Sequence, residues 1–209
     1  MNGTNMCTFI HRHEIPANKR PTYVRIVSDY REQKQDPYQV RCTVGGDRID
    51  FHGDVATKVA DLVTVKCLIN HIISTPGAKA ACIDIKDFYL NNPLPKAEYI
   101  RFQADLVPHD IWEQYDLQRF CDNGALYARV DKGMYGLPQA GRVANDHLLP
   151  RLQEAGYTAT GQTPGLFSQK DNDIVFALVV DDFLIHHTSD QALTHLIDTL
   201  QQHYTITVD

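Results

Sequence analysis

The sequence predicts an α+β fold, in which a small antiparallel sheet is backed by helices. One observation is a pair of apolar runs at 81–90 and 174–187, whose length and content of Val, Ile and Phe are typical of buried strands. The second is the segment 57–74, where apolar residues recur every three to four positions, as in a helix with one buried face. A chain of 209 residues with 43% hydrophobic content can bury a substantial core, and suggests one domain or one domain with a lobe.

Acidic residues interrupt both strand-like runs. Asp181 and Asp182 stand side by side within 174–187, and Asp84 and Asp87 lie within 81–90. An ionised carboxylate next to buried apolar segments needs a partner, so the sequence favours a tight turn whose acids face a cation. The alternative is an exposed acidic turn that touches only water. The same pattern, acids within an apolar run, occurs in two segments, and this repetition favours cation binding over an exposed turn.

The spacing of these acids points to phosphate chemistry. If Asp84 ends one strand and the Asp181–Asp182 pair forms the turn of a neighbouring hairpin, three carboxylates converge on one side of the sheet. Mg²⁺ prefers a few carboxylates completed by water and substrate phosphates, and two such ions can promote phosphoryl transfer. No GxxxxGK[ST] pattern occurs, which argues against a P-loop enzyme. For Asp87 a second role is open, the capping of local backbone.

The remaining elements follow from periodicity and from turn residues. Pro76–Gly77 ends the helix at 57–74, and Pro150 is expected to kink the helix that starts near Gln139. The other predicted elements are a strand at 22–30, a hairpin at 41–51 with its turn at 45–47, a strand at 81–85, a break at 91–95, strands at 99–102 and 125–130, helices at 108–119, 139–156 and 189–203, and a terminal strand at 204–208.

Composition restricts the location and the partners. The five cysteines are scattered without CxxC spacing, which fits a reducing compartment and argues against structural zinc. No secretory leader or membrane span is predicted, so we expect an intracellular protein with no membrane partner. The net charge of −6 is unusual for a protein that holds nucleic acid, although residues 1–50 carry a local excess of basic side chains.

Four motifs together resemble the reverse transcriptases of copia-like LTR retrotransposons. They are YVRIVSDYRE (23–32), CIDIKDFYLNNPL (82–94), KGMYGLPQAG (132–141) and FALVVDDFLI (176–185), and they occur in the same order as in that family. The resemblance implies a polymerase fold with fingers at 1–80 and a palm at 81–209, into which a fingers segment is inserted at about 98–131. It also implies a template of RNA or DNA with a primer, deoxynucleoside triphosphates, and a cytoplasmic particle or nuclear location.

The resemblance assigns roles to seven residues. Asp84, Asp181 and Asp182 match the catalytic acids that hold two Mg²⁺ ions, for which Mn²⁺ is a possible substitute. Arg25 falls where the fingers bind the triphosphate, and Lys19 would assist it. Tyr89 matches the aromatic residue at the sugar 2′ position, and Gln139 matches a residue beside nucleotide and template. Without the resemblance, Arg25 is a solvated charge on a strand, Tyr89 an ordinary core aromatic and Gln139 a residue at a helix start.

Two departures from the family keep other hypotheses open. Val179 stands where the family usually has the tyrosine of Tyr-x-Asp-Asp, and the chain is expected to lack a thumb and an RNase H module. A truncated or decayed retroelement product that binds nucleic acid or protein without polymerising is therefore an alternative. A nucleotide cyclase on a similar palm is a third hypothesis.

Overall fold

The computed structural model describes residues 4–32, 37–169 and 172–209, which form two compact units. The first unit comprises Met1–Val55 and Tyr89–Val143, and the second comprises Ala56–Phe88 and Ala144–Asp209. Each unit contains one sheet and helical segments, which confirms the mixed α+β composition that the sequence predicts. The assignment of the units to fingers and palm stays a prediction.

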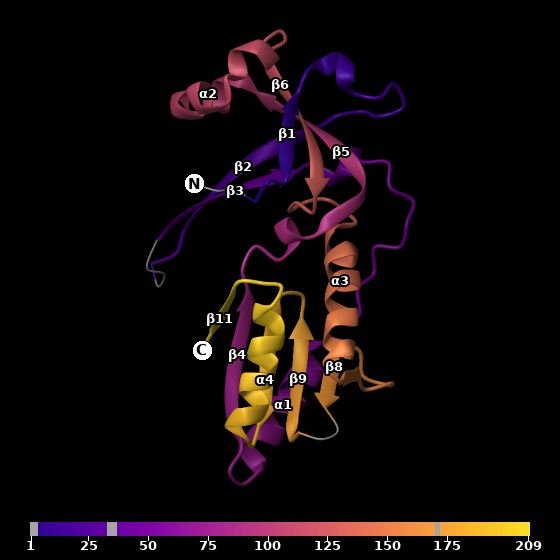
Figure 1. The fold of residues 1–209 in the computed structure, drawn as a ribbon, viewed down its shortest axis with the longest axis vertical. Coiled ribbons are helices and arrows are strands. Elements are labelled where there is room, and N and C mark those ends of the chain that lie inside the picture. Colours follow the sequence, from indigo (N-terminus) through magenta and orange to yellow (C-terminus); the bar gives the residue numbers. More distant parts are fainter. Residues whose placement is uncertain (1–3, 33–36, 170–171) are drawn as a thin grey trace. The chain divides into compact units, whose positions relative to one another are not determined.

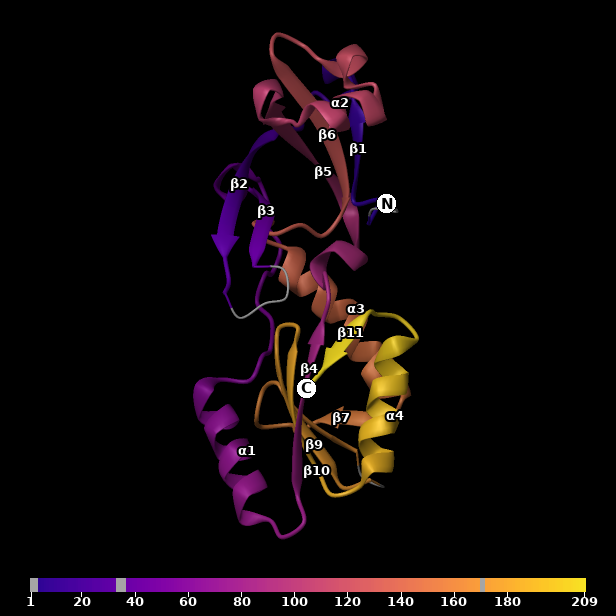
Figure 2. The ribbon, with the colours of Figure 1, turned by 90° about the vertical axis from the view of Figure 1, so that its left-hand side faces the viewer.

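The first unit is built on a five-stranded sheet (Figures 1 and 2). Its strands follow the order β1 (Cys7–Ile10), β6 (Ala125–Lys132), β5 (Pro93–Gln103), β2 (Thr22–Tyr30) and β3 (Tyr38–Val44). Neighbours are antiparallel except β2 and β5. Ile100, Ala128 and Val130 are fully buried and form the centre of the core. Helix α2 (His109–Tyr115) lies between β5 and β6 in the sequence.

The second unit has a six-stranded sheet between helices. The strand order is β11 (Ile206–Val208), β4 (Lys79–Ile85), β10 (Asp182–His187), β9 (Ile174–Val179), β8 (Leu166–Gln169) and β7 (Tyr157–Ala159), and every pair is antiparallel. Helices α1 (Leu62–Ser74) and α4 (Asp190–Gln201) lie on opposite faces of this sheet (Figure 2). Helix α3 (Ala140–Glu154) contains Pro150, as expected, and its residues are shared between the two units.

Helix α1 belongs to the second unit, although the expected division placed residues 1–80 together. The helix starts at Leu62 and not at Thr57, because Asp61 caps it by accepting a hydrogen bond of 2.7 Å from the Thr64 N–H. Just before it, the Ala60 N–H donates to the Leu178 carbonyl on β9 at 2.8 Å. The buried face of α1 packs through Leu68 against Ala177. These contacts attach residues 56–80 to the sheet of the second unit.

The hairpin predicted at 41–51 is wrong. Strand β3 pairs with the preceding strand β2, from Val24 opposite Val44 to Tyr30 opposite Tyr38, and not with residues 45–51. The Gly45–Gly46 pair does not form the predicted turn. It allows neighbouring groups to pack closely against the backbone. A Cβ atom on Gly45 would collide with the Tyr23 ring, and one on Gly46 with the Gly136 carbonyl. Gly46 therefore lets its backbone approach that of Gly136, and Gly45 leaves room for the Tyr23 ring.

The break predicted at 91–95 is also displaced. Strand β5 begins at Pro93, runs beyond both ends of the predicted strand at 99–102, and has an irregular register between Pro93 and Glu98. Proline at the first position of a strand removes no ladder hydrogen bond, so the residues that suggested a break start the strand instead.

Candidate active site

Two of the predicted acids face each other across neighbouring strands of the second unit. Asp84 near the end of β4 is the direct cross-strand partner of Asp182 at the start of β10. The next pair along joins the Ile85 N–H to the Asp181 carbonyl at 3.1 Å. Hydrogen-bonded and non-hydrogen-bonded pairs alternate in an antiparallel ladder, so Asp84 and Asp182 form a non-hydrogen-bonded pair, where Cα atoms lie about 4.5 Å apart.

Strand alternation places these acids at exposed positions of the sheet. In β4, Ala81, Ile83 and Ile85 are buried, whereas Asp84 between them is exposed. Thr207 on β11 is the partner of Asp84 on its other side, so Asp182, Asp84 and Thr207 form a row across three strands. Like charges directly opposite each other on a sheet are destabilising. A cation between the two carboxylates would remove that penalty.

Asp181 occupies the tight turn that connects β9 to β10. Val179 and Asp182 close the hairpin, which leaves Val180 and Asp181 as its two loop residues. Val180 has a φ of 63°. A β-branched residue rarely adopts this left-handed conformation, which glycine adopts readily. The turn therefore holds backbone strain beside the acidic pair.

The donor chemistry of the acidic pair fits a hard divalent cation. Carboxylate oxygens are the ligands that Mg²⁺ prefers, and it takes one or two of them together with water and phosphate oxygens. Within residues 4–32, 37–169 and 172–209, no three His, Cys, Asp or Glu side chains are gathered into a group that could hold a metal ion. The structure thus brings Asp84 and Asp182 together and leaves Asp181 at the adjacent turn position. The two-ion arrangement stays a prediction.

Arg25 lies in the first unit on an amphipathic ribbon made of β2 and β3. Its guanidinium donates to the Tyr23 hydroxyl at 2.8 Å and lies 5.1 Å from the centroid of that ring. The Tyr23 hydroxyl in turn donates to Asp47 at 2.8 Å. Arg25 is exposed, and its position on this face is set by the pairing of β2 with β3. An exposed guanidinium of this kind is suited to bidentate recognition of phosphate.

Lys19 and Gln139 converge on one carboxylate in the first unit. The Lys19 ammonium lies 2.9 Å from Oε2 of Glu98, and the Gln139 amide nitrogen donates to Oε1 of the same residue at 3.3 Å. The sequence predicted both Lys19 and Gln139 as substrate-binding residues but gave no reason for them to meet. Glu98 on β5 is the residue that joins them.

Tyr89 also belongs to the first unit and packs edge-on against Tyr135, with ring centroids 5.2 Å apart. A Cβ atom on Gly133 would collide with the Tyr89 backbone, so glycine at that position lets the segment 132–141 approach Tyr89.

Asp87 has a φ of 53° and takes part in the turn after β4. Asp84 lies in the second unit and Tyr89 in the first.

Comparison with known families decides the identity of the chain. Residues 10–208 match the family described as reverse transcriptase (RNA-dependent DNA polymerase). The chain is a member of the reverse transcriptase family. Its four motifs lie within the matched region, including the strands that carry Asp84 and Asp182. None of the helices in the described parts of this reverse transcriptase is both long and apolar enough to span a membrane.

Sequence reasoning missed two charged residues of the reverse transcriptase that the structure brings beside predicted ones. Glu98 is the first. Arg41 on β3 is the second, since it lies 5.7 Å from the centroid of the Tyr135 ring, which contacts Tyr89. Arg41 is the partner of Val27 and so shares a face with Arg25. A correct prediction of the pairing of β2 with β3 would have placed Arg41 on the same face as Arg25. No local sequence pattern marks Glu98.

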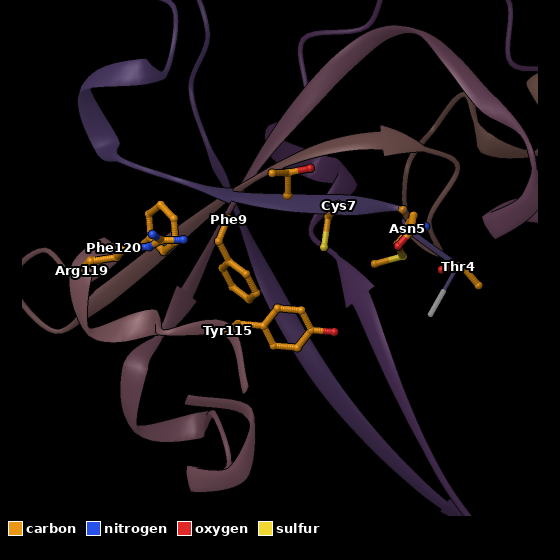
Figure 3. A pocket seen from close by; sticks show the side chains of 9 residues that line it. Thr4, Asn5, Cys7, Phe9, Tyr115, Arg119 and Phe120 are labelled. Carbon is orange, nitrogen blue, oxygen red and sulfur yellow. The ribbon is translucent and has the colours of Figure 1, made fainter. Parts of the chain in front are cut away.

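A cavity of about 410 Å³ in the first unit is separate from all seven predicted residues (Figure 3). Edge strand β1 contributes Cys7 and Phe9 to its lining, and Tyr115, Arg119 and Phe120 contribute from the segment after β5. The rings of Phe9 and Tyr115 lie 6.0 Å apart. The lining is mainly apolar and contains no acid, so this cavity does not resemble a cation site.

Proposed function

We propose that this chain is the catalytic region of an RNA-directed DNA polymerase of the copia-like group, which adds deoxynucleotides to a primer 3′ hydroxyl. Membership of the reverse transcriptase family and the four motifs support the proposal. The observation that carries the chemistry is the direct opposition of the exposed Asp84 and Asp182 on neighbouring strands. A divalent cation between the two opposed carboxylates would offset their mutual repulsion.

The proposed reaction is attack of the primer 3′ hydroxyl on the α-phosphate of a deoxynucleoside triphosphate, with pyrophosphate as the leaving group. Catalysis of this type rests on positioning and charge neutralisation. Asp84 and Asp182 would hold Mg²⁺ or Mn²⁺, with Asp181 as a further ligand. The bound cation would supply neutralisation of the phosphate charge.

The residues of the first unit have separate tasks in the proposal. Arg25 would bind the triphosphate through its exposed guanidinium, with Lys19 as a second positive charge. Tyr89 would contact the sugar of the incoming nucleotide, and Gln139 would orient the nucleotide by hydrogen bonding. The roles of Arg25, Tyr89 and Gln139 rest on their positions in the motifs. Lys19 lies outside the motifs, and its role is supported by its contact with Glu98, which it shares with Gln139.

The proposal is tested by Mg²⁺-dependent incorporation of dTTP on poly(rA)/oligo(dT). We expect Asp84→Asn, Asp181→Asn and Asp182→Asn each to lower incorporation by at least about 100-fold, because each removes a charge that faces the cation. Thermal unfolding of each variant shows whether the fold survives. Asp198→Asn, on the exposed side of α4, is the matched control and should leave incorporation unchanged.

The outcome also separates the proposal from its alternative. A wild-type chain that retains poly(rA)/oligo(dT) in filter binding without incorporating dTTP would contradict the polymerase and support a product that binds nucleic acid only. Incorporation that survives in all three acid variants would contradict the assignment of the acids.

A further inference from the structure

Glu98 is a buried carboxylate at the centre of a polar cluster in the first unit. The residue is only 8% exposed, and it lies on β5 opposite Val130. Burying an ionised carboxylate is costly unless it is paired and hydrogen-bonded. The Lys19 ammonium at 2.9 Å supplies the opposite charge. The Lys19 side chain is 29% exposed, so part of it is accessible to solvent.

The second partner of Glu98 is the side-chain amide of Gln139. This residue is 4% exposed and immediately precedes α3, where its backbone carbonyl accepts a hydrogen bond of 2.9 Å from the Val143 N–H. Both carboxylate oxygens of an ionised Glu98 can only accept hydrogen bonds. The amide must therefore present its NH₂ group to Glu98, as it does at 3.3 Å, and its carbonyl oxygen must point away.

The carbonyl oxygen of the Gln139 side chain is buried and has no hydrogen-bond partner within the described residues. A buried acceptor without a partner is destabilising. The cluster therefore keeps this acceptor oriented at a cost in stability. A ligand that offers a hydroxyl or N–H donor would recover that loss.

We propose that Glu98 is a positioning residue for the nucleotide, which fixes the Lys19 ammonium and turns the carbonyl oxygen of Gln139 toward a hydrogen-bond donor of the bound nucleotide. This inference rests on the proposed function, because the roles of Lys19 and Gln139 come from it. Glu98 itself touches no substrate in this proposal. It acts by selecting one of the two orientations of a neighbouring amide.

Glu98→Gln is the decisive variant, because it keeps the shape of the side chain and removes its charge. A glutamine at this position can donate or accept, so Gln139 is no longer forced to present its carbonyl oxygen. We expect the KM for dTTP on poly(rA)/oligo(dT) to rise about 10-fold while kcat changes by less than about 2-fold, the pattern of lost ground-state binding. Glu113→Gln, an exposed position on α2, is the matched control and should change neither constant.

A direct structural readout accompanies the kinetics. In ¹⁵N-labelled protein, Glu98→Gln should shift the Gln139 side-chain amide signals, and dTTP should perturb those signals in the wild type. Glu98→Asp keeps the charge with a shorter reach, so its KM should lie between those of the wild type and Glu98→Gln. If Glu98→Gln does not fold, Glu98→Asp provides the test. A purely structural Glu98 would instead lower the amount of folded protein with an unchanged KM.

The results distinguish the two proposals. An unchanged KM in Glu98→Gln, or in Glu98→Asp if only that variant folds, overturns the role of Glu98 while polymerisation stands. A wild type without incorporation overturns the proposed function, and dTTP-induced shifts of the Gln139 amide then decide Glu98 separately. Absence of those shifts in the wild type overturns the positioning role whatever the activity.

Discussion

His186 is a buried imidazole whose two ring nitrogens lack hydrogen-bond partners within the described residues. Its ring packs against that of His71, with centroids 4.5 Å apart. Burial lowers the pKa of His186, the neighbouring His71 and His187 lower it further, and Asp173 acts in the opposite direction. The residue is therefore held neutral in the folded protein.

We expect His186 to make the fold acid-sensitive. The unfolded chain protonates this histidine near its ordinary pKa of about 6.5, whereas the folded protein resists protonation down to a lower pH. Between the two values the unfolded state binds more protons, so the free energy of unfolding falls as pH is lowered below about 6.5. His186→Phe should flatten this dependence in thermal unfolding at pH 7.5 and pH 5.5. The exposed His203 gives the control His203→Asn, and an unchanged slope in His186→Phe would contradict the explanation.

Among the single residues of the candidate site, the acids were accessible from sequence and Glu98 was not. Asp84, Asp181 and Asp182 interrupt apolar runs, so the cost of burying charge marks them locally. Glu98 has no such signature, because its partners Lys19 and Gln139 are 79 and 41 residues away. Contacts of that length depend on the packing of several elements, which a local pattern does not contain.

The strained turn between β9 and β10 gives a prediction at the level of one element. A left-handed conformation at a residue such as Val180 costs of order 1–3 kcal/mol, and glycine adds an entropic cost of roughly 0.5–1 kcal/mol. Val180→Gly should therefore stabilise the protein by roughly 1 kcal/mol, measured by denaturant unfolding. Val175→Gly, within β9, should destabilise it, because glycine weakens a strand interior. A loss of stability in Val180→Gly would show that the turn is not strained.

Elements with strong local periodicity were predicted well. The strand expected at 22–30 coincides with β2 at Thr22–Tyr30, and the helix expected at 189–203 contains α4 at Asp190–Gln201. The error at 41–51 arose because Gly45 and Gly46 resemble turn residues, although they serve close packing against Tyr23 and Gly136. Sequence alone does not distinguish a glycine that turns the chain from one that admits a neighbouring backbone.

At the scale of the whole molecule, the opposed acids couple cation binding to stability. A ligand that binds only the folded state raises the free energy of unfolding, by about 1.4 kcal/mol at ten times its Kd. We expect MgCl₂ to raise the thermal midpoint of the wild type, and the double variant Asp84→Asn/Asp182→Asn to lose this increase. The control Asp198→Asn should keep it. An equal increase in the double variant would show that Mg²⁺ acts elsewhere.

The division into two units was the part of the architecture least accessible from sequence. Periodicity identified the helix that became α1 but not its partner; residues 56–80 group with the second unit, whereas the expected division placed 1–80 together. The contact of Leu68 with Ala177 joins positions more than one hundred residues apart. The strands that bear the acids could be recognised because each one shows the same local pattern, an apolar run interrupted by aspartate.

The ribbon of β2 and β3 has one face with Ile26, Tyr38 and Val40, all substantially exposed, and another with Arg25 and Arg41. Side chains alternate along a strand, so insertion or deletion of one residue within β2 would move the β2 side chains on one side of the change to the opposite face. If Arg25 moved in this way, its guanidinium would leave the face of Arg41 and point to the face that now carries Ile26. In this segment the number of residues is more constrained than their identity. We therefore expect homologues to differ here by substitutions and not by single-residue insertions or deletions.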